Sequence, residues 1–418
     1  TWETAVISIH DAVDAVLAAA RPLSDEEVPL LQALGRAAAG RIVSPEQVPT
    51  FANAAMDGFA VAGAELEAGR REFRVVVDIP AGRFVGEAVG PGDAARIMTG
   101  APLPPGVDTV VQVEHTTVSG DAVTVETAPE TGANVRPAGE DVAEGDVLFE
   151  QGAALGAAEV GLLAAVGIER VRVVRRPRVA ILATGSELIP AGRPLQPGQI
   201  RNSNSFTAYG QAVAAGADPI LLGIARDDPD ETRRLLAAAL ENDVVVTSGG
   251  VSVGDYDFVK QVQEELGVQR RFWGIATKPG KPLAFGTHGD TLVFGVPGNP
   301  VAAMVSFEMY VRPAILALQG RRDVYRPWFR AAAAEAVGPT KERTEVRRCR
   351  LSHVDGRVRF TTTGPQGSGI LSSMAGAEGL FFVPPHYPGG EPGVELVVML
   401  LAGSATERPP YPGARDVA

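Results

Sequence analysis

The chain has very few of the side chains that build redox and transition-metal centres. It contains one cysteine, Cys349, in 418 residues, which excludes an internal disulfide, a cysteine zinc site and an iron–sulfur cluster. Its five histidines argue against a histidine-rich metal centre. These counts leave carboxylates, hydroxyls, amides and backbone groups as the candidate ligands.

Basic charge and long uncharged apolar runs are also scarce. The 38 lysines and arginines are outnumbered by 50 acids, for a net charge of −12, which argues against general nucleic-acid binding. An anionic ligand therefore needs a local basic pocket. No run of about 18 uncharged apolar residues suggests a membrane span. Acids within the first 22 residues favour an amphipathic helix over a signal peptide. We therefore expect a cytoplasmic protein.

Glycine and proline are abundant, with 48 and 32 residues, yet no collagen period or low-complexity tract accompanies them. They predict many tight turns. A length of 418 residues with 45% hydrophobic residues predicts two to four domains with real cores.

The N-terminal half alternates helical and β-like patterns. Apolar spacing predicts a helix within residues 1–24, capped by Ser8, and a second helix over Asp25–Ala38. Short β-branched runs between glycine and proline turns predict a β-rich domain over residues 45–135. Ala157–Val166 is again helical in pattern.

Residues 176–325 repeat one unit, in which an apolar strand is followed by a glycine or serine turn and a helix. This pattern predicts a parallel sheet covered by helices on both faces. After Gly320, short strand-like segments predict a small barrel or sandwich, and we expect residues 405–418 to be loosely held.

In open parallel sheets, ligands bind beyond the carboxyl ends of the strands, where backbone N–H groups favour anions. The turn at residues 184–187 reads TGSE and suits either a phosphate approach or a plain tight turn. The turn at residues 247–257 reads TSGGVSVGDYD and predicts an anion cradle. It has neither the P-loop lysine nor GxGxxG. Asp257 is a candidate ligand, although it and Asp255 also suit a capping role.

Three further turns carry polar groups. Asp228 before Pro229 reads as a helix cap, which leaves Asp227 as the candidate ligand. The sequence KPGKP at residues 278–282 holds two lysines in a stiff loop, which favours an oxyanion clamp over a solvated turn. The sequence PGNP at residues 297–300 predicts a helix cap beside a ligand.

Three loops in the N-terminal half contain Asp57, Thr99 and Asp141. Each alone reads as a turn, but together they suggest loops converging on one pocket. An anion cradle, a lysine clamp and carboxylates favour divalent-metal-assisted phosphoryl chemistry. His115 and His288 have no serine-elbow partner, so a serine hydrolase is not predicted.

Taken in this order, the motifs resemble those of the molybdopterin molybdenumtransferases, the MoeA and gephyrin E-domain family. The matching stretches span essentially the whole chain: AAMDGFAV, RIMTGAPLPPGVDTVVQVE, VRPAGEDV, ILATGSEL, IRNSNS, RDDP, TSGGVSVGDYDFVK, KPGKPLAFG, VPGNPVAAM and GPQGSGILSSMAGAEGL.

The resemblance implies an enzyme of molybdenum cofactor biosynthesis. It would take adenylylated molybdopterin and molybdate, release AMP and insert molybdenum into the dithiolene, with Mg²⁺ as the divalent ion. The implied assembly is an elongated homodimer. Transient contacts with a molybdopterin adenylyltransferase and with cofactor-maturation proteins are expected, and none with nucleic acid or membrane.

The implied fold is multidomain α/β plus β. A doubly wound, mostly parallel α/β domain that binds molybdopterin is joined by a small helical and β linker domain to an inserted β domain, and a C-terminal β-barrel domain follows. The corresponding ranges are 1–24 with 176–325, 25–44 with 139–175, 45–138, and 326–418.

The family's functional positions are carried over by motif. The implied catalytic residues are Asp57, Thr99, Asp141, Glu187, Asp227 and Asp257. Of these, Glu187, Asp227 and Asp257 are the implied metal ligands, since carboxylates beside bound anions need a neutralising cation. The implied binding residues are Thr184, Gly185, Ser186, Ser248, Gly249, Gly250, Ser252, Lys278, Lys281, Pro297, Asn299, Pro300, Arg348 and Ser368.

Two positions leave alternatives open. Arg347 and Arg350 lie beside Arg348 and offer the same charge. Ala302 stands where relatives often have the serine of PGNPVS, which removes a hydroxyl beside the expected oxyanion. The competing functions are a molybdopterin adenylyltransferase, a tungstate-selective relative and a gephyrin-like scaffold. The retained acids argue against the scaffold.

Overall fold

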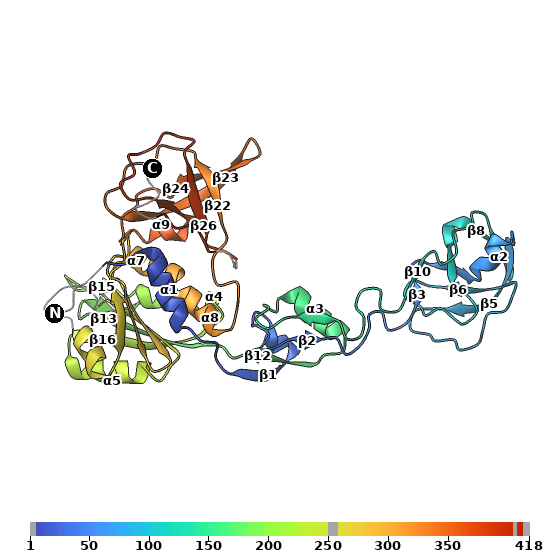
Figure 1. Cartoon of the computed structure of the whole chain (residues 1–418), viewed down its shortest axis with the longest axis horizontal. Helices are drawn as coiled ribbons and strands as arrows, with labels where there is room; N and C mark the ends of the chain where they lie inside the picture. The colour runs from blue at the N-terminus through green and yellow to red at the C-terminus, as the bar shows by residue number, and fades with distance from the viewer. Residues whose placement is uncertain (1–5, 250–257, 404–407, 413–418) are drawn as a thin grey trace.

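The computed structural model describes residues 6–249, 258–403 and 408–412. The molecule is elongated: an α/β part and a β-barrel lie together at one end, and a stalk connects them to a separate β-rich part at the other (Figure 1). The chain runs out along the stalk and returns along it, so residues near 25 and 170 lie side by side.

The α/β part is built on a six-stranded sheet in the order β16-β13-β17-β21-β20-β18. The first four strands are parallel, and β20 runs antiparallel to both of its neighbours, β21 and β18. All five residues of β17 are buried, as expected for a strand covered on both faces. The prediction of a mostly parallel sheet is confirmed. The bounds are β13 Arg178–Thr184, β16 Asp218–Ala225, β17 Val244–Ser248, β18 Gln269–Trp273, β20 Ala284–His288 and β21 Thr291–Val296.

Helices cover both faces of this sheet. Alternate residues of β13 pack into two cores: Val179 and Ile181 face one set of helices, and Ala180 and Leu182 face the other. The first set is α1 Ile9–Ala19, α4 Asn204–Ala214, α7 Pro300–Ser306, the π-helical turn η3 Phe307–Val311 and α8 Arg312–Leu318, and the second is α5 Pro229–Ala239 and α6 Phe258–Glu265.

Two predictions about these helices can be judged directly. The Ser8 hydroxyl accepts a hydrogen bond from Asp11 N at 3.1 Å, which confirms the predicted cap of α1. The continuous helix Pro300–Leu318 is long and apolar enough to cross a membrane by length and composition. It contains Glu308 and Arg312 and is 89% buried within the sheet-covering core, so it is a core helix.

The stalk consists of short paired strands and one helix. Strand β1 Asp25–Pro29 pairs antiparallel with β12 Arg170–Val174, and β2 Ile42–Val43 pairs with β11 Val147–Phe149. The 3₁₀ turn η1 Leu30–Ala33 and helix α3 Ala157–Ala165 pack over them. The predicted helix over Asp25–Ala38 is therefore wrong. Pairing with a strand some 145 residues away, which local periodicity does not reveal, overrides its helical spacing.

The distal part is a six-stranded sheet in the order β7-β4-β6-β5-β9-β8 with an apolar core on each face. Two short strands, β3 Asn53–Ala54 and β10 Val135–Arg136, pair where the chain enters and leaves it. The predicted β-rich character of this region is confirmed. The elements are β4 Gly58–Val61, α2 Gly63–Glu67, β5 Glu72–Ile79, β6 Asp93–Ile97, β7 Thr109–Gln112, η2 Val113–His115, β8 Thr116–Ser119 and β9 Ala122–Val125.

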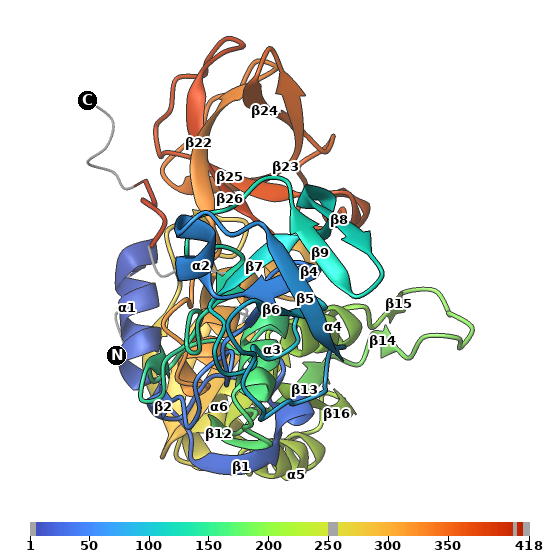
Figure 2. The same ribbon diagram turned by 90° about the vertical axis from the view of Figure 1, so that its right-hand side faces the viewer.

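The C-terminal part is a closed barrel, seen as a ring in Figure 2. Its five strands close because β23 pairs with both β24 and β25, and β19 Thr277–Lys278 adds parallel to β23 from the α/β part. The predicted barrel is confirmed. The strands are β22 Trp328–Ala333, β23 Thr344–Val354, β24 Arg357–Thr362, β25 Gly379–Val383 and β26 Glu395–Leu400, with helix α9 Ser372–Ala375 beside them.

Not all of the C-terminal tail is loosely held. Within the predicted loose tail, residues 408–412 are described, and the Tyr411 side chain is almost fully buried, with 4% exposure. Tyr411 stacks edge-on against His10 of α1 and against Phe382 of β25. The expectation is wrong for residues 408–412, because a proline-rich composition argues against a helix or strand but does not predict whether side chains are packed.

Candidate active site

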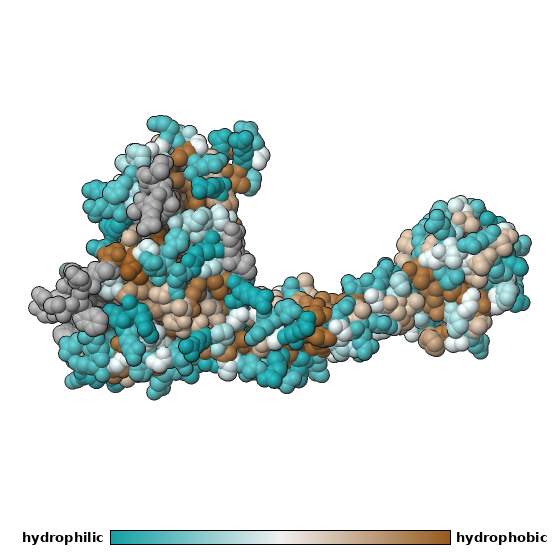
Figure 3. Space-filling model, viewed as in Figure 1, coloured by the Kyte–Doolittle hydropathy of each residue, from teal (hydrophilic) through white to brown (hydrophobic). Residues whose placement is uncertain are grey.

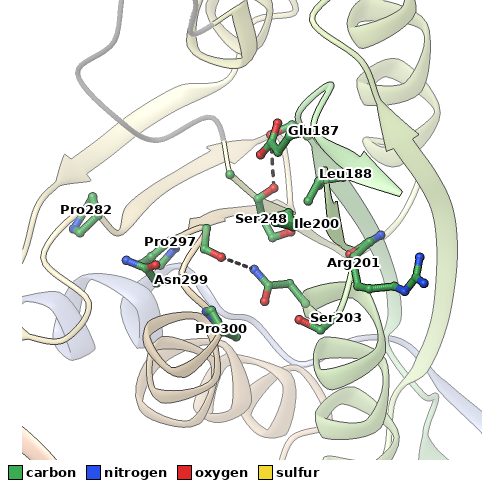
Figure 4. Close-up of a pocket in the computed structure, with 15 residues that line it drawn as sticks. Glu187, Leu188, Ile200, Arg201, Ser203, Ser248, Pro282, Pro297, Asn299 and Pro300 are labelled. Carbon is green, nitrogen blue, oxygen red and sulfur yellow. Dashed lines mark hydrogen bonds between the residues drawn. The ribbon is translucent and has the colours of Figure 1, made fainter. Parts of the chain in front are cut away.

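A cavity of about 610 Å³ opens at the carboxyl ends of β13, β17 and β21, between the N-terminal ends of α4 and α7 (Figure 4). A small arm containing β14 Leu188–Ile189 and β15 Ile200–Arg201 forms one wall. This is the edge that the strand-and-turn pattern predicts for a ligand. The cavity brings together the predicted residues Thr184, Glu187, Ser248, Gly249, Pro297, Asn299 and Pro300.

Two of its turns require glycine. Gly249 has φ +88°, and a Cβ there would lie 2.6 Å from the carbonyl oxygen of Thr184. Gly185 has φ +139°, and a Cβ there would lie 2.5 Å from the Glu187 carboxylate. The Thr184 hydroxyl donates to the Ser248 carbonyl at 3.2 Å and ties the two turns together. The floor of the cavity is thus formed by the backbone of two closely packed turns, with no side chain at Gly185 or Gly249.

The N-terminal ends of α4 and α7 border the same cavity, with part of their first-turn N–H groups already bonded: Ser205 N donates to the Asn202 side chain at 3.2 Å and Val301 N to the Ser368 carbonyl at 3.0 Å. Asn299 precedes α7 and Ser203 precedes α4, and neither side chain caps its helix. The Asn204 amide instead donates to the Gly298 carbonyl at 2.9 Å and ties the ends of the two helices together. Helix N-termini carry a partial positive charge, so this wall favours an anion.

The acids of the neighbouring turns are exposed at the strand ends. Glu187 lines the cavity (Figure 4). Asp227 and Ser186 are joined reciprocally: Asp227 N donates to the serine hydroxyl at 3.0 Å, and Ser186 N donates to the Asp227 carboxylate at 3.3 Å. Asp228 accepts from two first-turn N–H groups of α5, each at 2.9 Å, and so has the structural role that its position before proline predicts.

A second cavity, of about 620 Å³, lies between the α/β part and the barrel. It shares Pro282, Pro297 and Asn299 with the first cavity, so the two adjoin. Four cationic side chains and one carboxylate line it: Lys278, Lys281, Arg343, Arg347 and Glu345. Ser368 and Ala302 complete the wall. In a chain of net charge −12, this is the local basic pocket that an anionic ligand requires.

Glu345 organises two of these cations. One carboxylate oxygen accepts from Lys278 Nζ at 2.9 Å, and the other accepts from Arg347 at 2.8 and 2.9 Å. Burial acts to raise the pKa of Glu345, but the hydrogen bonds from Lys278 and Arg347 outweigh it and hold the pKa below its ordinary value. The carboxylate is therefore charged at neutral pH and fixes both cations at the cavity wall.

Comparison with known proteins identifies the family to which the chain belongs. Three family models match consecutive parts of the chain: the MoeA N-terminal region (domain I and II) over residues 7–167, a probable molybdopterin binding domain over 180–317 and the MoeA C-terminal region (domain IV) over 330–401. The molybdopterin molybdenumtransferase of Haemophilus influenzae is 39% identical over 84% of this chain and 88% of its own length. That of Bacillus subtilis is 34% identical over 94% of both.

The chain belongs to the molybdopterin molybdenumtransferase family. It is an enzyme, and the predictions of family and of enzymatic character are confirmed. A crystal structure of a molybdopterin biosynthesis MoeA protein from Pyrococcus horikoshii superimposes with a TM-score of 0.79 at 32% identity, covering 95% of this chain and all of that one. Matches to the N- and C-terminal models favour this family over the adenylyltransferase alternative.

Among the predicted family residues, Arg348 has a different place from the one expected. Its side chain is fully buried and donates to the carbonyls of Pro365, Gln366 and Gly367 and to the Ser373 hydroxyl, at 3.1 to 3.4 Å. Burial lowers the pKa of its guanidinium. Arg348 thus holds the loop that presents Ser368, and the arginines that line the cavity are Arg343, directly before β23, and the partly buried Arg347 on β23.

The three predicted residues of the N-terminal half do not line either cavity. Asp57 and Thr99 meet in the distal part, where one Asp57 oxygen accepts from the Thr99 hydroxyl and N–H, both at 2.7 Å. These bonds, the hydroxyl first, lower the pKa of Asp57. Asp141 is exposed where the stalk meets the distal part, and its N–H donates to the Val48 carbonyl. Figure 1 shows this part across the stalk from the α/β part.

The divalent ion that the family implies needs oxygen ligands close to the bound phosphates. Across residues 6–249, 258–403 and 408–412, no three histidine, cysteine or acid side chains gather in a way that would hold a metal. Glu187 and Asp227 nevertheless offer exposed carboxylate oxygens on neighbouring turns. Mg²⁺ usually takes one or two carboxylates together with substrate phosphates and water, so this donor set fits it.

Other predicted positions have different outcomes. Gly250, Ser252 and Asp257 lie outside the described residues. Sequence reasoning offered Arg347 only as an alternative to Arg348, and it missed Arg343 and Glu345 in the cationic cavity and Arg201 in the first cavity. A signal existed for two of them. Glu345 and Arg347 alternate with buried Val346 along β23, and that period of two places both on one face.

Proposed function

We propose that the chain inserts molybdate into adenylylated molybdopterin, with release of AMP, to give molybdenum cofactor. The observation that carries this proposal is the pair of adjoining cavities. One has a backbone floor and helix N-termini suited to phosphate, and the other is cationic and suited to a small oxyanion. A reaction between a phosphorylated pterin and an oxyanion needs both sites side by side.

Molybdate belongs in the cationic cavity. Lys278, Lys281 and Arg347 supply positive charge, and Ser368 supplies a hydroxyl. Their donors hold the oxyanion by charge-assisted hydrogen bonds, which are about twice as strong as neutral ones. Tungstate has nearly the same size and charge, and a competition titration with the two oxyanions decides which is preferred.

The phosphate groups of adenylylated molybdopterin belong over the backbone floor. Gly249 and Gly185 leave no side chain between the backbone of their turns and the anhydride, and the hydrogen bond from the Thr184 hydroxyl to the Ser248 carbonyl keeps the two turns in register. Glu187, Asp227 and Asp257 would hold Mg²⁺ against the anhydride. The bound ion would polarise phosphoryl oxygens and neutralise developing charge.

We further propose that the enzyme is a cytoplasmic homodimer divided into the four domains that the family implies. Apolar side chains are exposed on the stalk, among them Leu31, Leu34, Val43 and Val147 (Figure 3). Contiguous exposed apolar surface is typical of interaction sites. A transient contact with an adenylyltransferase would hand over the adenylylated substrate without release into solution.

The dimer gives Asp57, Thr99 and Asp141 a role. Since the stalk separates the distal part from its own cavities, these residues would complete the site of the partner subunit (Figure 1). Complementation tests this arrangement. Asp57→Ala and Glu187→Ala homodimers should each be inactive, and mixed heterodimers should regain up to about half of the sites, because one interface keeps both acids. Mixtures that stay inactive while both variants fold and dimerise would place Asp57 outside a shared site.

Activity itself is tested by incubating the protein with adenylylated molybdopterin, molybdate and Mg²⁺ while AMP and active cofactor are measured. AMP release that requires molybdate supports the proposal. Formation of adenylylated molybdopterin from ATP and molybdopterin would instead favour the adenylyltransferase alternative.

A further inference from the structure

The C-terminal residues 408–412 contact three separate parts of the chain. Arg408 forms an ion pair with Asp14 of α1 and donates to the Tyr325 hydroxyl at 3.1 Å. Its guanidinium also lies over the Tyr325 ring, 5.7 Å from the centroid. Tyr325 lies on the segment that joins α8 to the barrel. Arg408 therefore ties the tail to the α/β part and to the interdomain connection.

Tyr411 joins the two parts directly. Its ring centroid lies 5.5 Å from that of His10 on α1 and 5.3 Å from that of Phe382 on β25, both in edge-on geometry. The side chain is 4% exposed. An aromatic ring buried between two elements resists their separation, because opening the contact exposes apolar area on all three residues.

Pro412 reaches the strand that carries the cavity cations. Its carbonyl accepts a hydrogen bond from the Thr344 hydroxyl at 2.9 Å. Thr344 begins β23, and its N–H donates to the Ala276 carbonyl at 3.2 Å beside β19. The next residue, Glu345, holds Lys278 of β19 and Arg347 of β23. The tail is thus hydrogen-bonded to Thr344, the residue directly before Glu345 in the cationic cavity.

We propose that residues 408–412 form an interdomain clip that sets the geometry of the cationic cavity, with Tyr411 and Thr344 as its positioning residues. The cavity takes Lys278 and Lys281 from the α/β part and Arg347 from the barrel. Its width therefore depends on how the two parts are held together. Charge-assisted donors must lie within about 2.7–2.9 Å of the oxyanion, so a small rotation of the barrel removes one wall from the ligand.

The clip rests on the proposed function of the cavity, and its test separates the two. The full-length variants Tyr411→Ala, Tyr411→Phe and Thr344→Val are compared by calorimetric titration with molybdate and by steady-state kinetics. Tyr411→Ala and Thr344→Val should each weaken molybdate binding by about tenfold, the usual effect of losing one hydrogen bond to a charged ligand. The KM for molybdate should rise in parallel, while binding of adenylylated molybdopterin stays unchanged.

Tyr411→Phe should behave as wild type, since it keeps the ring. Phe360→Leu is the matched control: Phe360 is buried in the barrel core against Phe381, away from the clip. It should lower thermal stability without changing molybdate affinity. Unchanged molybdate affinity in folded Tyr411→Ala would overturn the clip. If Tyr411→Ala does not fold, unchanged affinity in Thr344→Val overturns it, because that variant keeps the ring contacts.

Hydrogen exchange gives a readout independent of ligand. The amide proton of residue 344, which is hydrogen-bonded to the Ala276 carbonyl, should exchange with solvent faster in Tyr411→Ala and Thr344→Val than in wild type and the Phe360→Leu control. Equal exchange in all four would overturn the clip. If wild type binds no molybdate while exchange changes as expected, the clip stands and the assignment of molybdate to the cavity fails.

Discussion

Replacing Arg348 should destabilise the barrel and weaken anion binding together. The guanidinium is fully buried and makes four hydrogen bonds, three of them to consecutive carbonyls of the loop at residues 365–367. The loop leads directly to Ser368, whose carbonyl accepts from Val301 N of α7 at 3.0 Å. Arg348 therefore supports a loop that bridges the barrel and the α/β part at the anion cavity.

The size of the effect follows from these bonds. A hydrogen bond to a charged group contributes about 1.5–3 kcal/mol, and relief of the desolvation of the buried charge offsets part of the sum. Arg348→Met should therefore lower the free energy of unfolding by about 3 kcal/mol. Arg348→Lys should restore little, because one ammonium group has no planar fork for three carbonyls.

Denaturant unfolding and molybdate titration of both variants provide the assay. We expect loss of stability and loss of affinity to occur together, and the lysine variant to resemble the methionine variant. A different pattern would refute the reasoning: unchanged stability with affinity lost in Arg348→Met and largely retained in Arg348→Lys would mean that Arg348 contacts the anion itself.

The remaining predictions concern single side chains in the two cavities. Gly249→Ala should reduce AMP release more than Gly192→Ala does, because both have φ above +80° but only Gly249 has a carbonyl in the way; equal turnover in the two variants would argue against the close approach. Ala302→Ser should tighten molybdate binding by about tenfold in a titration, since it adds a donor to the cavity wall, and unchanged or weaker binding would show that the hydroxyl is irrelevant here. Glu345 has a pKa below its ordinary value, so its ion pairs stabilise the fold above the unfolded pKa of about 4.3 and are lost on acidification. Glu345→Gln should therefore make the melting temperature less pH-dependent below that value. The same fall in melting temperature at acid pH in both proteins would contradict this.

The large elements were predictable because their sequence patterns are local. Near-continuous apolar strands such as Val244–Ser248 identify a buried parallel sheet, and the short strand-like segments after Gly320 are spaced as the strands of a small barrel are. The Asp25–Ala38 region was not predictable in this way. Its helical spacing is real, but the strand Asp25–Pro29 depends on a partner at Arg170–Val174 that no short window contains.

In the candidate site, too, the residues in local sequence patterns were predictable and those that depend on distant contacts were not. Glycine and proline turns after strands identified the backbone floor, because Gly185 and Gly249 adopt conformations that other residues disfavour. Arg348 and Arg347 were harder to separate, since motif position alone ignores the alternation of β23, which buries one and turns the other to the cavity. The contact of Asp57 with Thr99, 42 residues apart, required the folded distal sheet.

The central claim is that the two adjoining cavities carry out one reaction on a phosphorylated pterin and molybdate. The most direct measurement is AMP release from adenylylated molybdopterin with Mg²⁺, at increasing molybdate concentration, for wild type and Lys281→Ala. We predict saturable, molybdate-dependent release in wild type, and in Lys281→Ala a raised molybdate requirement with unchanged pterin binding, since Lys281 lines only the cationic cavity. Absence of AMP from wild type with authentic substrate, or an identical molybdate dependence in both proteins, would contradict the account.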